Sequence, residues 1–292
     1  MSKTINSKLI LGTVQMGLAY GINNTIGKIS LENSHDILEY AFDNGIKILD
    51  SAEAYGSAHQ IIGSFHKKNK KKIFEVITKL PHKFDDAIND KVSSYLIDLN
   101  ITQLHALLFH SFSSYKENIN SFKVLTDLKA NGKIKYIGVS VYTNEEIEAV
   151  LLNDEVDMIQ LPFNLFDNLN LRRDVLRKAK SKGKIVHTRS ALLQGLFFKD
   201  ISSNNITIKS LNKELLQLSN IIKKRKVSIV KLALNYCLEQ KTIDNVLIGV
   251  DSKKQLEDNL RVVGQRLETS IVDDINNIKI TNSNLLNPSL WN

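Results

Sequence analysis

The sequence predicts an α/β protein, a closed (β/α)8 TIM barrel, and two observations point to it. Short apolar runs recur along the 292 residues at intervals of roughly 25–35 residues, and segments with helical spacing separate them. The runs are nearly continuous in apolar residues, which is typical of parallel strands that are covered on both faces. We therefore expect a single domain over residues 1–292, with an extra C-terminal helix and a tail at 281–292.

The main alternative to a barrel is an open doubly wound sheet, which usually carries a glycine-rich phosphate turn after its first strand. Here the first run continues as Gly12-Thr-Val-Gln-Met-Gly17, which lacks that pattern, so we prefer the barrel. The eight runs are Leu9–Leu11, Ile46–Asp50, Phe74–Thr78, Ala106–Phe109, Tyr136–Val139, Met158–Leu161, Ile185–Thr188 and Val246–Ile248.

Start and stop signals mark the helices between these runs. Ser30 precedes a helical pattern that stops at Asn44-Gly45, and Thr143 with Glu146 forms a capping-box pattern. Ser252 and Gln255 offer the same device after the eighth strand. Further helices are expected at Leu125–Ala130, Val175–Ser181, Gln255–Val263 and, beyond the eighth unit, Ile271–Ile280.

Composition and charge narrow the class of protein. The chain is 42% hydrophobic and 24% charged, and it contains no apolar run long enough to cross a membrane. Its N-terminus is too polar for a secretory signal, and the single cysteine, Cys237, cannot form an internal disulfide, so we expect a cytoplasmic protein. The formal charge of +8 comes largely from runs at 66–72 and 223–226, which lack aromatic residues and coincide with predicted helix ends. They therefore do not indicate nucleic-acid binding.

Four polar residues follow three consecutive strands, at the end of a barrel where active sites lie. Asp50 ends the second run and is soon followed by Tyr55, while Lys79 and His110 end the third and fourth. Asp50 and Lys79 can pair, and a protonated Lys79 beside Tyr55 would lower the pKa of the phenol. Tyr55 is then predicted to give a proton to a developing alkoxide, and His110 to orient the carbonyl.

This set of residues resembles the catalytic tetrad of the aldo-keto reductase superfamily. Leu-Asp-Ser-Ala-Glu-Ala-Tyr-Gly at 49–56 is similar to a family signature, as are the segments at 11–13, 137–140, 160–164 and 255–259. The resemblance extends from about residue 9 to 264 and implies reduction of an aldehyde or ketone by a nicotinamide dinucleotide, without metal or flavin. NADPH is the family default, and NADH is not excluded.

The resemblance also implies cofactor contacts. Ser140 and Gln160 would bind the nicotinamide carboxamide, and Arg189 stands where many members have an aromatic residue under the nicotinamide. Gln255 replaces the arginine that commonly binds the 2′-phosphate of NADPH. The other implied contacts are Gly12, Thr13 and Val14 at the ribose, Ser190 and Leu192 along the nicotinamide and pyrophosphate, and Gly249, Ser252, Lys253 and Asn259 at the adenosine end.

The sequence gives less direct information about the substrate. Phe112, Tyr115 and Asn164 are predicted to wall its pocket, and the polar connection at 197–209 favours a hydroxylated molecule. We expect a keto- or aldehydo-sugar derivative, nucleotide-linked forms included, as the small-molecule partner; the oligomeric state is open. The alternatives are a broad-specificity detoxifying aldehyde reductase and a low-turnover NADP(H)-binding regulatory subunit. An aldolase with a Schiff base on Lys79 would need that amine neutral, and Asp50 argues against it.

Overall fold

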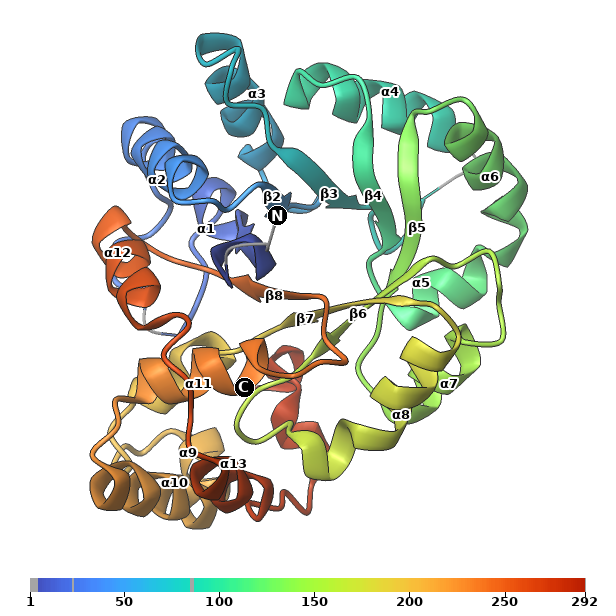
Figure 1. Ribbon diagram of the computed structural model, residues 1–292. Coiled ribbons are helices and arrows are strands. Elements are labelled where there is room, and N and C mark those ends of the chain that lie inside the picture. The colour runs from blue at the N-terminus through green and yellow to red at the C-terminus, as the bar shows by residue number, and fades with distance from the viewer. Residues whose placement is uncertain (1–4, 23, 85–86, 292) are drawn as a thin grey trace.

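Eight parallel strands close into a barrel in which each strand pairs with the next along the chain and β8 pairs with β1 (Figure 1). This computed structural model describes residues 5–22, 24–84 and 87–291. The eight predicted strands are confirmed, with ends that differ by at most two residues. The strands are β1 (Leu9–Gly12), β2 (Ile48–Asp50), β3 (Glu75–Lys79), β4 (Leu104–Phe109), β5 (Ile134–Ser140), β6 (Met158–Pro162), β7 (Ile185–Arg189) and β8 (Asn245–Ile248).

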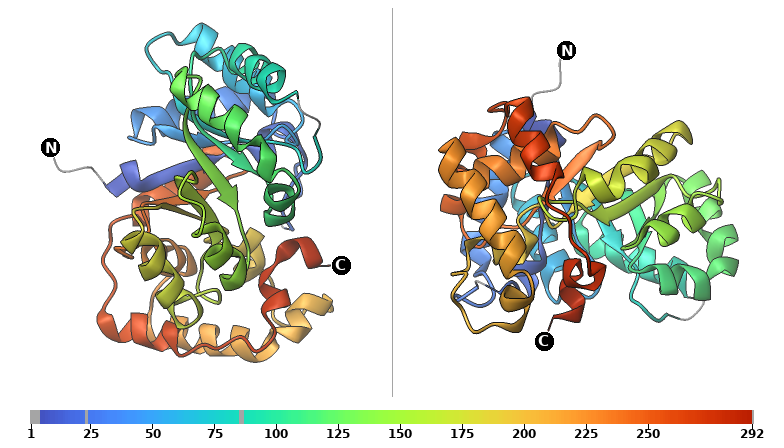
Figure 2. Two further views of the ribbon diagram at one scale, coloured as in Figure 1. Left: turned by 90° about the vertical axis from the view of Figure 1, so that its right-hand side faces the viewer. Right: turned by 90° about the horizontal axis from the view of Figure 1, so that it is seen from below.

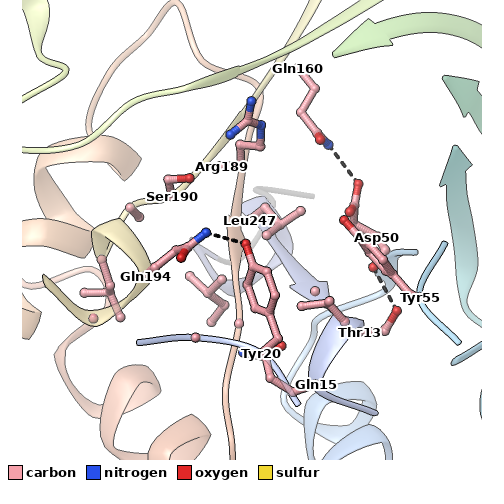
Figure 3. A pocket seen from close by; sticks show the side chains of 18 of the residues that line it. Thr13, Gln15, Tyr20, Asp50, Tyr55, Gln160, Arg189, Ser190, Gln194 and Leu247 are labelled. Carbon is pink, nitrogen blue, oxygen red and sulfur yellow. Dashed lines mark hydrogen bonds between the residues drawn. The ribbon is translucent and has the colours of Figure 1, made fainter. Parts of the chain in front are cut away.

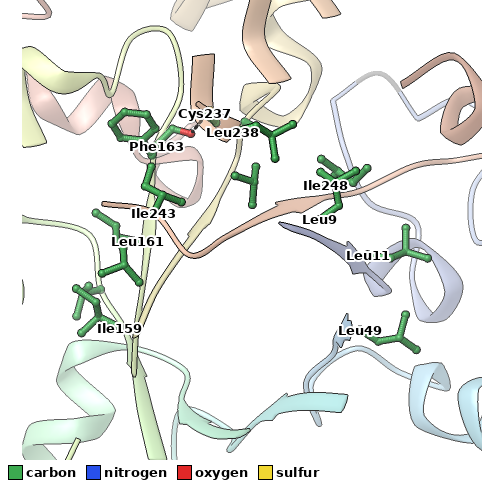
Figure 4. Packing of buried hydrophobic residues seen from close by; sticks show 14 of the residues in the cluster. Leu9, Leu11, Leu49, Ile159, Leu161, Phe163, Cys237, Leu238, Ile243 and Ile248 are labelled. Carbon is green, nitrogen blue, oxygen red and sulfur yellow. Dashed lines mark hydrogen bonds between the residues drawn. The ribbon is translucent and has the colours of Figure 1, made fainter. Parts of the chain in front are cut away.

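The strands bury both faces, which explains their continuous apolar sequence. Ile10 and Leu108 are fully buried in a small cluster formed by strand residues alone, on the inner side of the barrel. Leu9 and Leu11 alternate with Ile10 and belong to a larger cluster that also contains the helices (Figure 4). Each fully buried Leu or Ile side chain contributes about 1.5–3 kcal/mol to folding.

Helices surround the barrel on its outside (Figures 1 and 2). The Ser30 cap is confirmed by its hydroxyl, which accepts a bond from Asn33 N–H, and the Thr143–Glu146 capping box is complete. The main helices are α1 (Val14–Gly17), α2 (Leu31–Asp43), α3 (Ala58–Lys68), α4 (Ile88–Leu99), α5 (Phe112–Glu117), α6 (Phe122–Ala130), α7 (Asn144–Val150), α8 (Leu169–Ser181), α9 (Ile206–Ser210), α10 (Asn212–Arg225), α11 (Ile229–Leu238), α12 (Lys253–Val262) and α13 (Thr269–Asn276).

The remaining segments bear on the site in two ways. The predicted C-terminal helix is present as α13, and the tail beyond it forms short 3-10 turns and reaches the barrel mouth. The basic runs lie at the C-terminal ends of α3 and α10, as predicted, where lysine favours the helix dipole. None of the helices in the described segments is long and apolar enough to span a membrane.

Candidate active site

A cavity of about 960 Å³ opens among the C-terminal ends of the strands (Figure 3). That volume lies at the upper end of the range of ligand sites, which run to roughly 1,000 Å³. Asp50, Tyr55, Lys79 and His110 all line it, so the barrel brings together the four residues that the sequence singled out.

The ion pair between Asp50 and Lys79 is buried at the floor of this cavity. Lys79 Nζ lies 2.5 Å from Asp50 Oδ1, and each side chain is only 3% exposed. Gln160 donates to the other carboxylate oxygen at 2.8 Å, and the Asp50 backbone carbonyl accepts from the amide and hydroxyl of Thr13. Burial lowers the pKa of Lys79, and Asp50 opposes that shift. The amine is held as one half of an ion pair, which does not suit a Schiff-base nucleophile.

Tyr55 follows β2 and is placed by a close approach of two backbones. A Cβ on Gly17 would lie 1.6 Å from the Tyr55 carbonyl oxygen, so only glycine lets α1 pack there. Burial raises the pKa of the Tyr55 phenol, and the Asp50 carboxylate acts in the same direction. The predicted lowering of this pKa is therefore wrong: burial of the phenol outweighs any effect of Lys79, whose ammonium is paired with Asp50 and lies 5.5 Å from the centre of the phenol ring.

His110 faces the phenol as a neutral imidazole. Its ring lies edge-on to Tyr55, with ring centroids 6.1 Å apart. Burial lowers the pKa of His110 to about 3, and the nearby charges of Lys79, His82 and Arg189 add to the effect. His82 stacks on the outer side of the ring at 4.5 Å, so the imidazole is fixed between two aromatic neighbours. A neutral ring in this place can donate one hydrogen bond to an oxygen in the cavity.

Buried polar atoms without partners identify where a cofactor would fit. Gln160 Oε1 and Gln15 Oε1 are both buried and accept no hydrogen bond, although both residues line the cavity. Ser140 on β5 pairs in register with Gln160 on β6. A Cβ on Gly249 would lie 2.7 Å from Gln15 Nε2, so the glycine keeps the lining open. Orphan acceptors beside an open cradle fit the carboxamide N–H groups and the ribose hydroxyls of a nicotinamide dinucleotide, both of which can donate to them.

The segment after β7 is strained where it borders the cavity. Ser190, Leu193 and Gln194 have φ angles of 63°, 45° and 52°, which cost L-residues roughly 1–2 kcal/mol each. Such strain persists only where other contacts enforce it, and it is common at ligand sites. One such contact is the bond from Gln194 Nε2 to the Tyr20 hydroxyl, 2.5 Å long, which joins this segment to the loop after β1 (Figure 3).

The sequence-predicted cofactor residues largely meet at this cavity. Ser252 and Lys253 do not, because they line a separate depression beside α2, where Lys253 Nζ lies 5.4 Å from the Tyr40 ring centre. Ser252 instead caps α12 by accepting from Gln255 N–H, while Gln255 accepts from Asp251 N–H. Those that line the cavity are Gly12, Thr13, Val14, Ser140, Gln160, Arg189, Ser190, Leu192, Gly249, Gln255 and Asn259.

The predicted substrate-pocket residues lie elsewhere and require a correction. Phe112 and Tyr115 stack on each other, and Tyr115 packs on Phe109 in the core between β4 and its helix. Asn164 is fully buried, and its side-chain oxygen accepts from the N–H of Phe166. The sequence predicted that these side chains line the cavity, but they pack in the core or stabilise a turn. The position of a residue in a loop does not determine the direction of its side chain.

Several cavity residues were missed by the sequence argument. His82 follows β3, Tyr142 follows β5, and Tyr20 lies in the loop after β1. Asn287 reaches the lining from the C-terminal tail. A rule that inspects the first three residues after every strand would have found His82 and Tyr142. Nothing local to the sequence marks Tyr20 or Asn287, because long-range folding of their segments brings them to the mouth.

A phenol, an ion pair and a neutral imidazole at the mouth of a parallel barrel, beside a dinucleotide-sized cavity, define a carbonyl oxidoreductase. Residues 8–280 match the aldo/keto reductase family, and the chain belongs to that family. Members of this family reduce carbonyls with a nicotinamide cofactor.

Named relatives and solved structures agree with this assignment. The chain is 24% identical to the NADH-specific methylglyoxal reductase of Escherichia coli, over 89% of this chain and 91% of that protein. It is 25% identical to the D-arabinose 1-dehydrogenase of Saccharomyces cerevisiae, over 90% and 86%. The holo form of an aldo-keto reductase from Bacillus halodurans superposes with a TM-score of 0.77 at 18% identity, over 94% and 93% of the two chains. The glycerol dehydrogenase of Gluconobacter oxydans gives 0.70 at 22%, over 92% and 90%.

Proposed function

We propose that this aldo-keto reductase reduces a small hydroxylated aldehyde or ketone, with Tyr55 as the proton donor. The observation that carries the proposal is the convergence of Tyr55, His110 and the Lys79–Asp50 pair on one cavity beside the orphan acceptor of Gln160. A reduced nicotinamide bound there supplies a hydride to the carbonyl carbon. The residues of the chain then have to hold the carbonyl oxygen and deliver a proton to it.

Tyr55 and His110 divide these two tasks. Because its pKa is raised, Tyr55 is fully protonated at neutral pH and holds the proton ready. An alkoxide is a stronger base than a phenolate, so transfer from Tyr55 to a developing alkoxide is favourable. Neutral His110 donates a hydrogen bond to the same oxygen and fixes its position. The ion pair of Lys79 and Asp50 fixes the floor of the cavity and leaves it nearly neutral in net charge. The Lys79 ammonium also lies close enough to Tyr55 to stabilise the phenolate that remains after proton transfer.

The substrate preference follows from the polar side chains near His110. His82, Ser111 and Ser113 line this part of the cavity, with Asn287 from the tail. Hydroxyl, imidazole and amide groups bind sugar hydroxyls by hydrogen bonds and offer little to a steroid or a large aromatic ring. A keto- or aldehydo-sugar derivative, free or nucleotide-linked, is therefore our first candidate. A small reactive aldehyde is the second, because a relative is named a methylglyoxal reductase.

The charges at the adenosine end support NADH over the family default of NADPH. Asp251 lines the cavity there, and a carboxylate repels a 2′-phosphate, whereas the charge of Asp258 is matched by Lys254 and Arg261. The two lysines nearby do not offset the Asp251 charge freely, because Lys254 pairs with Asp258 at 2.6 Å and Lys253 lies over Tyr40. Gln255, which stands where family members commonly have arginine, is uncharged. We place the enzyme in the cytoplasm, where its single thiol, Cys237, stays reduced in the core.

Titration of the purified protein with NADH and with NADPH, followed by nicotinamide fluorescence, tests the cofactor. We expect micromolar binding and a preference for NADH. A panel of D-arabinose, methylglyoxal, dihydroxyacetone and a nucleotide-linked keto-sugar then tests the substrate by oxidation of the bound cofactor. Turnover of the sugars above methylglyoxal supports the first candidate, and the reverse order supports the detoxifying enzyme. Tight binding without turnover on any member supports a regulatory subunit, and no binding of either dinucleotide contradicts the proposal.

A further inference from the structure

Arg189 is a cation of the cavity that forms no ion pair with a carboxylate of the described residues. It ends β7 and is half-buried, and its guanidinium carbon lies over the Tyr142 ring, 4.1 Å from the ring centre. The only hydrogen bond of the guanidinium within the described segments runs to the Val141 carbonyl, and it is a long one at 3.5 Å. No carboxylate of residues 5–22, 24–84 and 87–291 forms an ion pair with it. Because no ion pair of the described residues compensates it, this positive charge acts on any molecule that binds in the cavity.

The position of this charge relates it to the nicotinamide end of the cavity. Gln160 and Arg189 lie on the neighbouring strands β6 and β7, and both side chains extend into the cavity (Figure 3). A carboxamide that donates to the orphan Gln160 Oε1 puts its attached ring within the field of the guanidinium. That field is already felt at the reacting centre, because Arg189 adds, after burial, Lys79 and His82, to the lowered pKa of His110.

We propose that Arg189 makes this enzyme discriminate between the two oxidation states of its cofactor, binding the reduced dinucleotide more tightly than the oxidised one. The inference rests on the proposed function. An oxidised nicotinamide ring carries a positive charge and a reduced ring carries none, so a fixed neighbouring cation opposes only the oxidised form. An aromatic side chain would act in the opposite sense, since the face of a π-system attracts a cation.

The Tyr142 ring is part of the same device. Its ring contacts the guanidinium, and a buried ion pair holds the backbone of Tyr142. Arg172 donates to the Tyr142 carbonyl at 2.5 Å and pairs with Asp167, which is fully buried. The cation is therefore pre-positioned and does not have to be ordered when the cofactor binds.

The consequence for the catalytic cycle is faster release of the oxidised cofactor. A cofactor that gives up its hydride to a carbonyl would change the charge of its nicotinamide ring from neutral to positive. Beside Arg189, that conversion weakens the binding of the spent cofactor and favours its exchange for a reduced one. A preference of at least about tenfold is expected for two charges near each other in a partly solvated site.

Equilibrium binding separates this role from a structural one. Dissociation constants of NADH and NADPH are measured by nicotinamide fluorescence, and those of NAD⁺ and NADP⁺ by competition. The variants are Arg189→Gln, which removes the charge, Arg189→Lys, which keeps it without the planar group, and Arg173→Gln, an exposed arginine on α8 as control. If Arg189→Gln does not fold, Arg189→Met serves in its place.

We expect the wild type to bind the reduced form at least about tenfold more tightly. Arg189→Gln should bring the ratio close to one, chiefly by tighter binding of the oxidised form, while Arg189→Lys and Arg173→Gln keep the wild-type ratio. Equal weakening of both forms in Arg189→Gln would show a packing role only and overturn the inference. A raised KM for anionic carbonyls with an unchanged ratio would overturn it in favour of substrate binding. If the wild type binds both forms equally, this inference fails alone; if it binds neither, the proposed function fails.

Discussion

Replacing Asp50 by Asn tests the buried ion pair, because it removes one charge and leaves its partner in place. Lys79 Nζ would then be an ammonium at 3% exposure without a carboxylate. Asn also has only one acceptor oxygen in place of the two that now accept from Lys79 and Gln160, so Gln160 loses its acceptor unless its amide turns over. Breaking a buried pair in this way costs about 3–5 kcal/mol of folding free energy.

The pH dependence of that loss has a defined sign. Burial already lowers the pKa of Lys79 below its ordinary value of 10.5, and removing Asp50, which raises it, lowers it further. Between the lowered folded value and 10.5 the unfolded chain binds more protons than the folded chain, so stability rises with pH there. The deficit of Asp50→Asn relative to wild type is therefore larger at neutral pH than at alkaline pH.

Urea unfolding followed by circular dichroism, at about pH 7 and about pH 9.5, measures both quantities. Glu148→Gln is the matched control, because Glu148 pairs with Lys178 at 3.2 Å with both side chains about half exposed. It should change the unfolding free energy by less than about 1 kcal/mol at either pH. Asp50→Asn as stable as the control, or a deficit that grows with pH, would refute the reasoning that Lys79 is a buried ammonium held by Asp50.

Three further outcomes are expected. Gly17→Ala should reduce kcat by about a hundredfold with little change in dinucleotide affinity, because its Cβ would displace the Tyr55 backbone; unchanged kcat would contradict the close approach. Tyr20→Phe should raise the dissociation rate of the dinucleotide several-fold in stopped-flow, since it removes the acceptor that Gln194 uses across the cavity, and an unchanged rate would show that this bond does not retain the cofactor. Because the folded pKa of His110 is lowered to about 3, its contribution to stability is full above its ordinary value of 6.5 and declines as pH falls below it. His110→Gln should flatten that acid limb in thermal unfolding, and an unaltered limb would argue against a buried neutral ring.

The barrel was predictable because its signal is distributed. Eight continuous apolar runs, each followed by a helix with legible caps such as Ser30 and Thr143, specify parallel strands covered on both faces. The tetrad was predictable for a related reason. Asp50, Lys79 and His110 each terminate or immediately follow a strand, and the topology brings strand ends to one rim whatever the loops do.

The failures concern direction and charge balance, which a sequence does not encode locally. Phe112 and Tyr115 stand close after the strand end that carries His110, yet Tyr115 turns into the core against Phe109, and Phe112 stacks on Tyr115. The sign of the shift in the Tyr55 pKa depended on how deeply the phenol is buried and on the Asp50 carboxylate, which raises the same pKa. Lys253 was predicted to contact the cofactor, but its amine lies over the Tyr40 ring and lines a separate depression.

The measurement that tests the central claim most directly is turnover and dinucleotide binding of Tyr55→Phe beside the wild type. The variant removes one hydroxyl and nothing else from the cavity, so dinucleotide affinity should stay within about twofold while kcat falls by roughly 100- to 10,000-fold, the range of a lost general acid. The loss should appear in the first turnover, which separates chemistry from product release. A variant that keeps wild-type turnover would show that another group delivers the proton, and the role assigned to Tyr55 would be wrong.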